Sequence, residues 1–133
     1  MTDSLNDAGR ALIDRPVIAT LATVATDGGP QATPLWIEVE GDDLMVNTAQ
    51  GRAKARNVER DHRVAVTVID PGNPYNVVVV RGTVTEVTTD GADAHIDRLA
   101  KKYLGVDSYP MRRPDETRIT VRIRTDHIVM QPE

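Results

Sequence analysis

Apolar and polar positions alternate with a period of two along most of the chain. Short β-branched or alternating runs occupy residues 17–24, 31–40, 44–48, 63–70, 77–89 and 118–124. Alternation of this kind is typical of strands with one buried face, and the short turn segments between them favour antiparallel pairing. Gly82 interrupts the fifth run, where we expect a β-bulge or a close backbone approach. The pattern predicts six strands in a mostly antiparallel sheet, and the chain length favours closure into a small barrel.

Three other segments have the spacing of helices. The first covers residues 4–14, with Ser4 as its expected N-cap and a proline after its end. The second follows Gly51. The third runs from about Asp90, its expected cap, to Gly105, its expected stop. The sequence therefore predicts a mainly β fold with flanking helices.

Composition supports a β-rich core and narrows the function. The chain has 133 residues, 40% of them hydrophobic, with no Phe and one Trp. Val, Ile, Leu and Ala must therefore form the core, and no linker or repeat divides residues 1–133, so we predict a single domain. There is no Cys, which excludes disulfides and catalytic thiols. No signal-peptide or membrane-spanning pattern is present, so we expect a cytoplasmic protein without a membrane partner.

The motifs of several large enzyme classes are missing. The chain has no G-x-G-x-x-G, no G-x-x-x-x-G-K-[ST] and no G-x-S-x-G. His62, His95 and His127 stand singly, without a metal-binding spacing, and we interpret each as a surface or structural residue. Neither of the two serines is placed for a catalytic triad. An enzyme with this sequence would therefore take its reactive group from a bound cofactor.

The charge order at the start of the second helix is unusual. Arg52, Lys54 and Arg56 all precede the first acidic residue, although the N-terminus of a helix is positive and favours acidic side chains. Together with the free backbone N–H groups, these cations would bind an anion, and phosphate suits them best. The alternative is a solvated helix in which Arg56 and Arg60 pair with nearby carboxylates. That alternative leaves the three cations at the N-terminus unexplained, so we favour the anion site.

Trp36 is a second candidate site residue. On a continuous strand over residues 31–40, the apolar positions from Leu35 to Val39 face the core, which places Pro34 and Trp36 on the opposite face. That face either meets a partner subunit or forms the wall of a pocket for a flat ring, and both can hold at once.

The last predicted strand carries an arginine stripe. Arg118, Arg122 and Arg124 alternate there with apolar residues. We interpret the stripe as the solvent-facing side of the barrel, because a polar face opposite a core face is usual in antiparallel sheets.

The order of the elements and the segment "ATLATVATDGGPQATPLWIEVEGDDLMVNTAQGRAKARNVERDHRVAV" resemble a known family of proteins. They are similar to the pyridoxamine 5′-phosphate oxidase-like split β-barrel oxidoreductases, and more closely to the branch that uses the deazaflavin coenzyme F420. The similarity extends to "VVVVRGTVTEV" and "YPMRRPDETRITVRIRTDHIV". It implies a six-stranded antiparallel split β-barrel of the flavin-binding type, and a homodimer with two cofactor sites at the subunit interface.

The resemblance also implies a set of cofactor-binding residues. The segment "GRAKARN" would hold the cofactor phosphate, the segment "TPLW" would lie along the flat ring, and "NTA" would approach the ring through side chain and backbone. Tyr75 and Arg81 are placed near the neighbouring subunit's site by position alone. The implied set is Thr33, Pro34, Leu35, Trp36, Asn47, Thr48, Ala49, Arg52, Lys54, Asn57, Tyr75 and Arg81.

The function expected from the resemblance is that of an F420-dependent reductase, which transfers a hydride to a small conjugated or electrophilic acceptor. No catalytic acid or base from the protein is implied, and no metal is expected. One alternative is an FMN-dependent oxidase or reductase on the same barrel, although the pattern R-x-K-x-R-N fits the deazaflavin branch better. A second alternative is a carrier that binds F420 or a flavin without turnover. The net charge of −4 and the shortage of aromatic residues disfavour a nucleic-acid partner.

Overall fold

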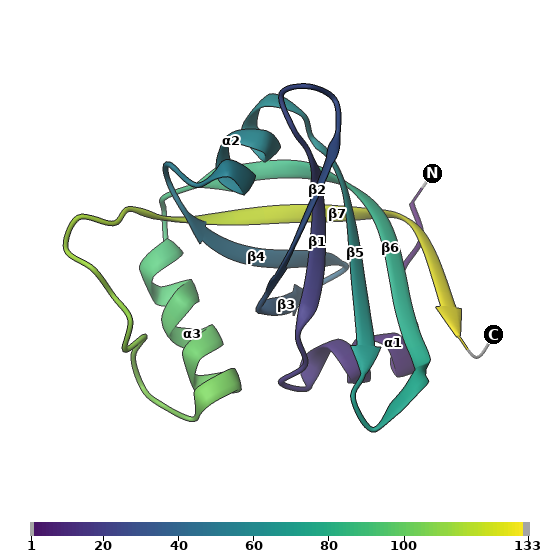
Figure 1. Cartoon of the computed structure of the whole chain (residues 1–133). Coiled ribbons are helices and arrows are strands. Elements are labelled where there is room, and N and C mark those ends of the chain that lie inside the picture. Colours follow the sequence, from purple (N-terminus) through teal and green to yellow (C-terminus); the bar gives the residue numbers. More distant parts are fainter. Residues whose placement is uncertain (1, 132–133) are drawn as a thin grey trace.

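One curled antiparallel sheet forms the centre of the computed structural model, which describes residues 2–131 (Figure 1). The strands are β1 (Ala19–Val24), β2 (Pro30–Leu35), β3 (Ile37–Glu40), β4 (Asp43–Ala49), β5 (Arg63–Asp70), β6 (Asn73–Thr88) and β7 (Arg118–Gln131). Their order in the sheet is β2-β1-β5-β6-β7-β4-β3, and each neighbouring pair is antiparallel. The predicted mainly β architecture of the split-barrel type is confirmed.

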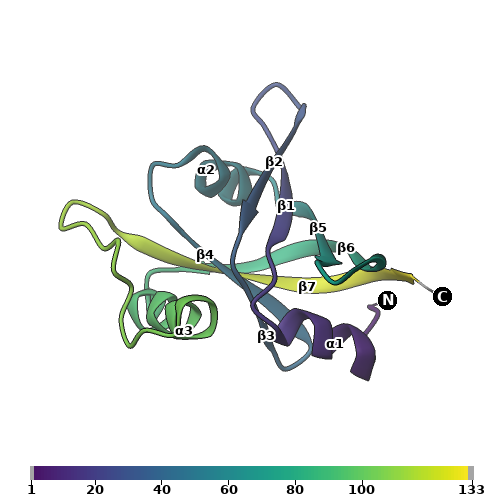
Figure 2. The same cartoon turned by 60° about the horizontal axis from the view of Figure 1, so that its bottom comes forward.

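Within residues 2–131, three helices flank the sheet. They are α1 (Asp7–Asp14), α2 (Ala53–Arg60) and α3 (Ala92–Leu104). Figure 2 shows them at separate places around the curled sheet, with α3 and α1 on different sides of it. Among the described residues, no helix is long and apolar enough to cross a membrane.

In the described part of the chain, the sheet has seven strands rather than the predicted six, because the expected strand over residues 31–40 is broken at Trp36. The pairing of β1 with β2 ends at Leu35, and the pairing of β3 with β4 begins at Ile37. Consecutive strands β2 and β3 therefore lie at the two opposite ends of the strand order. Since the sheet curls, the chain crosses from one edge to the other through this single residue, which leaves a half-closed barrel.

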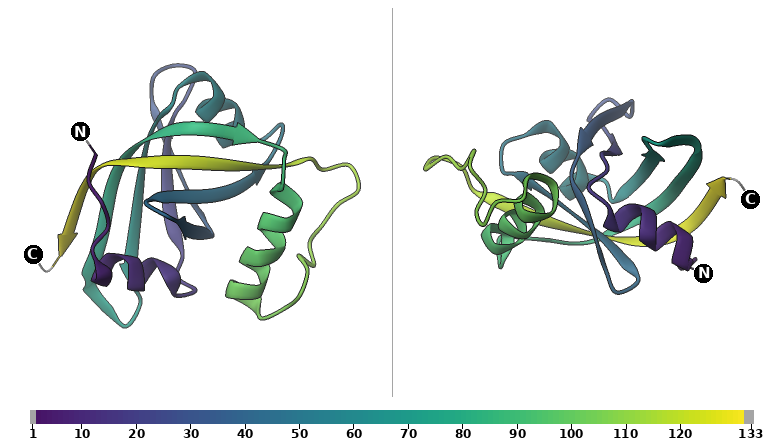
Figure 3. Two further views of the ribbon diagram at one scale, coloured as in Figure 1. Left: turned by 180° about the vertical axis from the view of Figure 1, so that it is seen from behind. Right: turned by 90° about the horizontal axis from the view of Figure 1, so that it is seen from below.

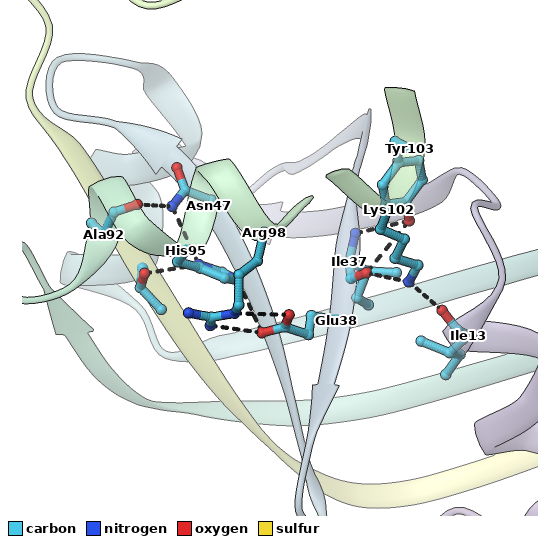
Figure 4. Close-up of polar contacts among 10 residues, drawn as sticks. Ile13, Ile37, Glu38, Asn47, Ala92, His95, Arg98, Lys102 and Tyr103 are labelled. Atoms are coloured by element: carbon cyan, nitrogen blue, oxygen red, sulfur yellow. Dashed lines mark hydrogen bonds and ion pairs between the residues drawn. The ribbon is translucent and has the colours of Figure 1, made fainter. Parts of the chain in front are cut away.

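Two side chains from α3 bind the backbone at this crossing (Figure 4). The Ile37 N–H donates to the Tyr103 hydroxyl at 3.1 Å, and that hydroxyl donates to the Val17 carbonyl at 2.7 Å. The Lys102 ammonium donates to the carbonyls of Ile37 at 2.8 Å and Ile13 at 2.5 Å. Burial lowers the pKa of Lys102. These bonds give polar partners to backbone groups that would otherwise be left unpaired inside the protein.

The core lies inside the curl of the sheet and consists of aliphatic side chains, as the composition requires. Its largest fully buried members come from α1, α2 and most of the strands: Ile13, Leu21, Ile37, Leu44, Val46, Val58, Val66, Val68, Ile119 and Ile123. Helix α1 lies across one end of the curl (Figures 1 and 3). Aliphatic packing of this kind compensates for the absence of Phe.

Two helix caps differ from the prediction and one agrees with it. Helix α1 begins after Asn6, whose side-chain oxygen accepts from the Gly9 N–H at 2.8 Å, so Asn6 is the cap in place of Ser4. Helix α3 is capped by Gly91, at φ 72°, rather than by Asp90. Gly105, also at φ 72°, ends that helix as predicted, because a left-handed C-cap favours glycine.

The last two strands are longer than predicted. Strand β6 starts at Asn73, so most of the expected loop before residue 77 belongs to the sheet, and β7 continues to Gln131. At Gly82 the register shifts, and a Cβ atom there would lie 2.6 Å from the Arg124 carbonyl oxygen. The expectation of a bulge with close backbone approach at Gly82 is confirmed.

Candidate functional site

A cleft of about 170 Å³ lies where the β2–β3 crossing meets β4, the start of α2, α3 and the segment that leads into β7. Its lining residues are Pro34, Leu35, Trp36, Asn47, Arg52, Lys54, Ile96, Leu99, Tyr109, Met111 and Arg118. The first six of these belong to the site set that the sequence predicts. The fold thus brings the two separate candidates, Trp36 and the basic helix start, to one place.

The N-terminus of α2 has the reversed charge order that the sequence indicates. Arg52 is the N-cap, no side chain caps the helix, and its first turn has no acidic residue. Arg56 donates to the carbonyl of Gly51, and Arg60 donates to the carbonyl of Val24 at 2.6 Å. Arg56 and Arg60 thus bind backbone carbonyls, so the alternative in which they pair with neighbouring carboxylates does not account for their positions.

Two of the three cations at the cleft, Arg52 and Arg118, share one carboxylate. Glu116 accepts from Arg118 at 2.7 Å and from Arg52 at 3.2 Å, and the hydrogen bond from Arg118 lowers the pKa of Glu116. Within residues 2–131, no carboxylate forms an ion pair with Lys54, which is half-buried. Burial and the two neighbouring arginines lower the pKa of Lys54. An anion bound at this position would relieve the excess of positive charge.

Two aromatic residues, Trp36 and Tyr109, line the cleft, and the Tyr103 ring stacks on Trp36. The rings of Trp36 and Tyr103 lie 5.1 Å apart and 10° from parallel. Tyr109 meets Trp36 edge-on at 6.0 Å, and the Arg118 guanidinium carbon lies 5.3 Å from the Tyr109 ring centre. Such rings give a flat, largely apolar surface of the kind that planar ligands pack against.

The Asn47 side chain is held at both ends by other residues (Figure 4). Its Nδ2 donates to the Ala92 carbonyl at 2.9 Å and lies 3.2 Å from His95 Nδ1, while its Oδ1 accepts from Arg118 Nε at 2.8 Å. Its amide group therefore links β4, α3 and β7 beneath the cleft.

Other members of the predicted site set lie outside the cleft. Thr33 is half-buried on β2, and Thr48 and Ala49 are buried near the end of β4. Thr48 Oγ1 has no hydrogen-bond partner in the described part of the chain. Asn57 donates to Thr23 Oγ1 and Gln31 Oε1, each at 3.0 Å. Asn57 thus fixes α2 to the β1–β2 hairpin.

Tyr75 and Arg81 lie on β6, away from the cleft. Tyr75 is 78% exposed. Arg81 lines a separate cavity of about 420 Å³ on strands β1, β5, β6 and β7 and the first residue of β2. Ile69 on β5, Val79 on β6 and Ile18, just before β1, are large apolar residues that remain exposed.

Sequence reasoning missed several residues of the cleft. It assigned Arg118 to a solvent-facing stripe, but Arg118 is only 6% exposed. This interpretation was wrong because β7 pairs with β4, with Arg118 opposite Ala49, and the segment before β7 covers that end of the strand. Tyr109 is brought to Trp36 by a loop whose Tyr109 N–H donates to Asp97 on α3 at 2.8 Å. No local sequence signal marks such a contact.

The comparisons with known proteins agree with this geometry. The chain matches the pyridoxamine 5′-phosphate oxidase family over residues 5–129. It is similar to an F420 reductase of known structure, with 31% identity, a TM-score of 0.82, and coverage of 94% of this chain and 98% of that one.

Two further structures share the fold alone. One is a conserved hypothetical protein from Mycobacterium tuberculosis, at 22% identity and a TM-score of 0.72, covering 95% of this chain and 84% of that one. The other is an FAD- and heme-binding protein from Mycobacterium smegmatis, at 19% identity and a TM-score of 0.68, covering 96% of this chain and 70% of that one. The resemblance inferred from the sequence is thus confirmed: the chain belongs to the pyridoxamine 5′-phosphate oxidase family of oxidoreductases.

Proposed function

We propose that the protein is an F420-dependent reductase that reduces a small conjugated or electrophilic acceptor. The proposal rests mainly on Lys54, which lines the cleft with Trp36 at the N-terminus of α2. Lys54 is half-buried, and within residues 2–131 it has no ion-pair partner. The similarity to an F420 reductase along nearly the full length of both chains supports a deazaflavin over a flavin.

The residues at the cleft fit an anionic cofactor with a planar ring. Lys54 and Arg52 offer a point charge and a planar pair of donors, which suit phosphate or carboxylate oxygens. The free N–H groups at the start of α2 add further donors. Pro34 and Trp36 provide the apolar surface along which the ring would lie.

When bound, the cofactor supplies the hydride, and the chain supplies binding and orientation. Lys54 and Arg52 would fix the anionic part of the cofactor, which limits the positions that its ring can take. Trp36, held by Tyr103, would fix the plane of the ring. Tyr109 and Met111, which also line the cleft, would keep water away from it.

We also propose that two copies of the chain complete the site. The cleft volume of about 170 Å³ is below the range of about 300–1,000 Å³ that is common for cofactor pockets. One chain therefore offers only part of a site for a flavin-sized molecule. The exposed apolar residues Ile18, Ile69 and Val79 would be covered in a dimer, and Tyr75 and Arg81 on β6 would then reach the partner's site.

Sedimentation velocity at micromolar concentration tests the dimer. The wild-type protein should sediment as a dimer, and Val79→Arg should sediment as a monomer, since it places a charge in the proposed apolar interface. Val106→Arg is the matched control, because Val106 is equally exposed, at 36% against 37% for Val79, but lies in the loop after α3. A monomeric wild-type protein, or a Val79→Arg dimer, contradicts this proposal.

Fluorescence titration of the purified protein with F420 and, separately, with FMN tests the proposed cofactor. We expect F420 to bind more tightly than FMN and more weakly as the salt concentration rises, because ions screen the cations at the cleft. A preference for FMN would support the alternative of an FMN-dependent oxidase or reductase. Binding of F420 without oxidation of its reduced form by any acceptor would support a carrier, and binding of neither would overturn the proposal.

A further inference from the structure

His95 is a buried histidine that the proposed chemistry does not use. Its side chain is 1% exposed, and it projects from α3 towards β4 and β7 (Figure 4). Its Nδ1 lies 3.2 Å from Asn47 Nδ2 and 2.9 Å from Thr120 Oγ1. A hydroxyl can donate or accept, so the Asn47 contact decides which form of the ring is present.

The surroundings of Asn47 determine which end of its amide faces His95. The Ala92 carbonyl needs a donor, and the Arg118 Nε–H needs an acceptor. A reversed amide would place oxygen against the Ala92 oxygen and an N–H against the Arg118 N–H. The NH₂ group must therefore face His95, whose Nδ1 is then an acceptor without a proton.

The other side of the ring faces a carboxylate. Glu38 Oε1 lies 3.6 Å from His95 Nε2, and Arg98 holds Glu38 through bonds of 3.0 and 3.3 Å. The negative charge favours a proton on Nε2. The charged groups around the ring are thus Glu38 on β3, Arg98 on α3 and Arg118 on β7. Burial lowers the pKa of His95 to about 4, so the ring is neutral at pH 7.

We propose that His95 is a positioning residue of the cleft: its neutral ring, protonated on Nε2, orients the Asn47 amide so that Asn47 holds the Arg118 guanidinium at the cleft wall. A proton on Nδ1 would set donor against donor, and loss of that acceptor would leave the Asn47 N–H unpaired. Either change would weaken the hold on Arg118. The role of His95 is exerted through Asn47, without contact with the ligand.

Arg118 carries the effect to the cleft surface. Its guanidinium donates to Glu116 and lies over the Tyr109 ring, which in turn meets Trp36 edge-on. A displaced Arg118 would therefore disturb both the anion-binding and the aromatic walls of the cleft. The predicted effect on cofactor affinity rests on the proposed function, whereas the orientation of Asn47 and Arg118 does not.

Two variants of His95 separate the acceptor from the packing. His95→Asn places an amide oxygen near the position of Nδ1 and keeps an acceptor for Asn47. His95→Leu has a similar volume to His and offers no acceptor. Thermal unfolding of both variants is measured first, so that only folded protein is compared.

The first readout needs no ligand. Nitrogen NMR of the wild-type ring should show Nε2 protonated and Nδ1 unprotonated at pH 7. The Arg118 Nε–H should exchange slowly with solvent in the wild-type protein and in His95→Asn, and rapidly in His95→Leu. A proton on Nδ1, or a slowly exchanging Arg118 Nε–H in His95→Leu, overturns the proposal. If His95→Leu does not fold, the proposal is still tested by the ring protonation of the wild-type protein and by the Arg118 Nε–H exchange rate in His95→Asn.

The second readout is the affinity for F420. We expect His95→Leu to weaken binding about tenfold, the effect of losing roughly one charge-assisted hydrogen bond, and His95→Asn to bind within about threefold of the wild type. Equal affinity in all three proteins would overturn the role at the cleft. If the NMR results are as expected but the wild type binds no F420, the proposed function fails while the positioning role stands.

Discussion

The ring of Trp36 lies flat against the ring of Tyr103, with their centres 5.1 Å apart and their planes 10° from parallel. Trp36 is also the residue at which the chain crosses from one edge of the sheet to the other. Because the Tyr103 hydroxyl binds the Ile37 N–H next to it, a single helical side chain stabilises both the crossing and the wall of the cleft.

Tyr103→Phe should keep the ring contact and lose the hydrogen bonds of the hydroxyl. The Ile37 N–H and the Val17 carbonyl would then lack this partner in a half-buried place. We expect the free energy of unfolding to fall by about 1–3 kcal/mol, measured by urea denaturation. Tyr75→Phe is the control. Because Tyr75 is 78% exposed, this substitution should change the free energy of unfolding by no more than about 0.5 kcal/mol. Equal effects of the two substitutions would show that the hydroxyl of Tyr103 has no special role.

The local alternation of apolar and polar residues was sufficient to predict the strands in which that alternation is clear. The predicted runs over residues 44–48 and 63–70 agree with β4 and β5 to within one residue at each end. It was insufficient at Trp36, because the nearest Pro, Pro34, lies two residues earlier within β2 and no Gly or Pro stands at the break itself. The bonds at that break come from Tyr103, far along the chain, and a sequence pattern holds no information about such a contact.

The start of β6 shows the same limit of local sequence patterns. Residues 73–76 contain Pro and two Asn and favour a loop by propensity, yet they begin β6. Asn73 pairs with Asp70 of β5, and from Val77 onward the strand pairs with both β5 and β7, so tertiary context overrides the weak local preference of this segment.

The sequence revealed part of the candidate site. The charge order around Lys54 could be found because it contradicts the helix dipole, which is a local property. Arg118 could not be assigned to the site from the alternation, because alternation alone cannot tell which polar face of a strand is later covered by a loop.

Gly82→Ala should destabilise the protein more than an ordinary glycine substitution in a strand. Its Cβ would lie 2.6 Å from the Arg124 carbonyl oxygen and 2.7 Å from Ile123 Cγ2. We expect a loss of about 1–3 kcal/mol, as for other overpacked positions. Gly72→Ala is the matched control, because its Cβ would meet Asp70 at an ordinary 3.5 Å. A Gly82→Ala protein as stable as Gly72→Ala would exclude close packing as the reason for this glycine.

The pH dependence of stability should report the buried state of His95. Its pKa is about 4 in the folded protein and 6.5 in the unfolded chain, so the unfolded state binds more protons between these values. Stability should therefore be highest above pH 6.5 and fall as the pH drops towards 4, by an amount on the order of 3 kcal/mol.

Urea unfolding at pH 7, 5.5 and 4.5 measures this loss, with His95→Asn as the comparison. The variant lacks the titrating ring, so its stability should change less across the same window. If the stabilities of the two proteins change with pH in parallel, His95 does not titrate as its burial requires.

The central claim is that Lys54 binds the anionic part of the cofactor. The matched comparison is Lys54→Gln against Lys101→Gln, because Lys101 is an exposed lysine on α3 that does not line the cleft. Both variants lose one positive charge, so long-range electrostatic effects are similar, and only Lys54→Gln removes the donor at the cleft.

The most direct measurement is the F420 dissociation constant of these two variants and the wild type, at one fixed salt concentration. Loss of a charge-assisted hydrogen bond costs about 1.5–3 kcal/mol, so Lys54→Gln should bind roughly 10- to 150-fold more weakly. Lys101→Gln should bind like the wild type. If Lys54→Gln and Lys101→Gln bind F420 equally well, Lys54 is a surface charge and the proposed cofactor site is wrong.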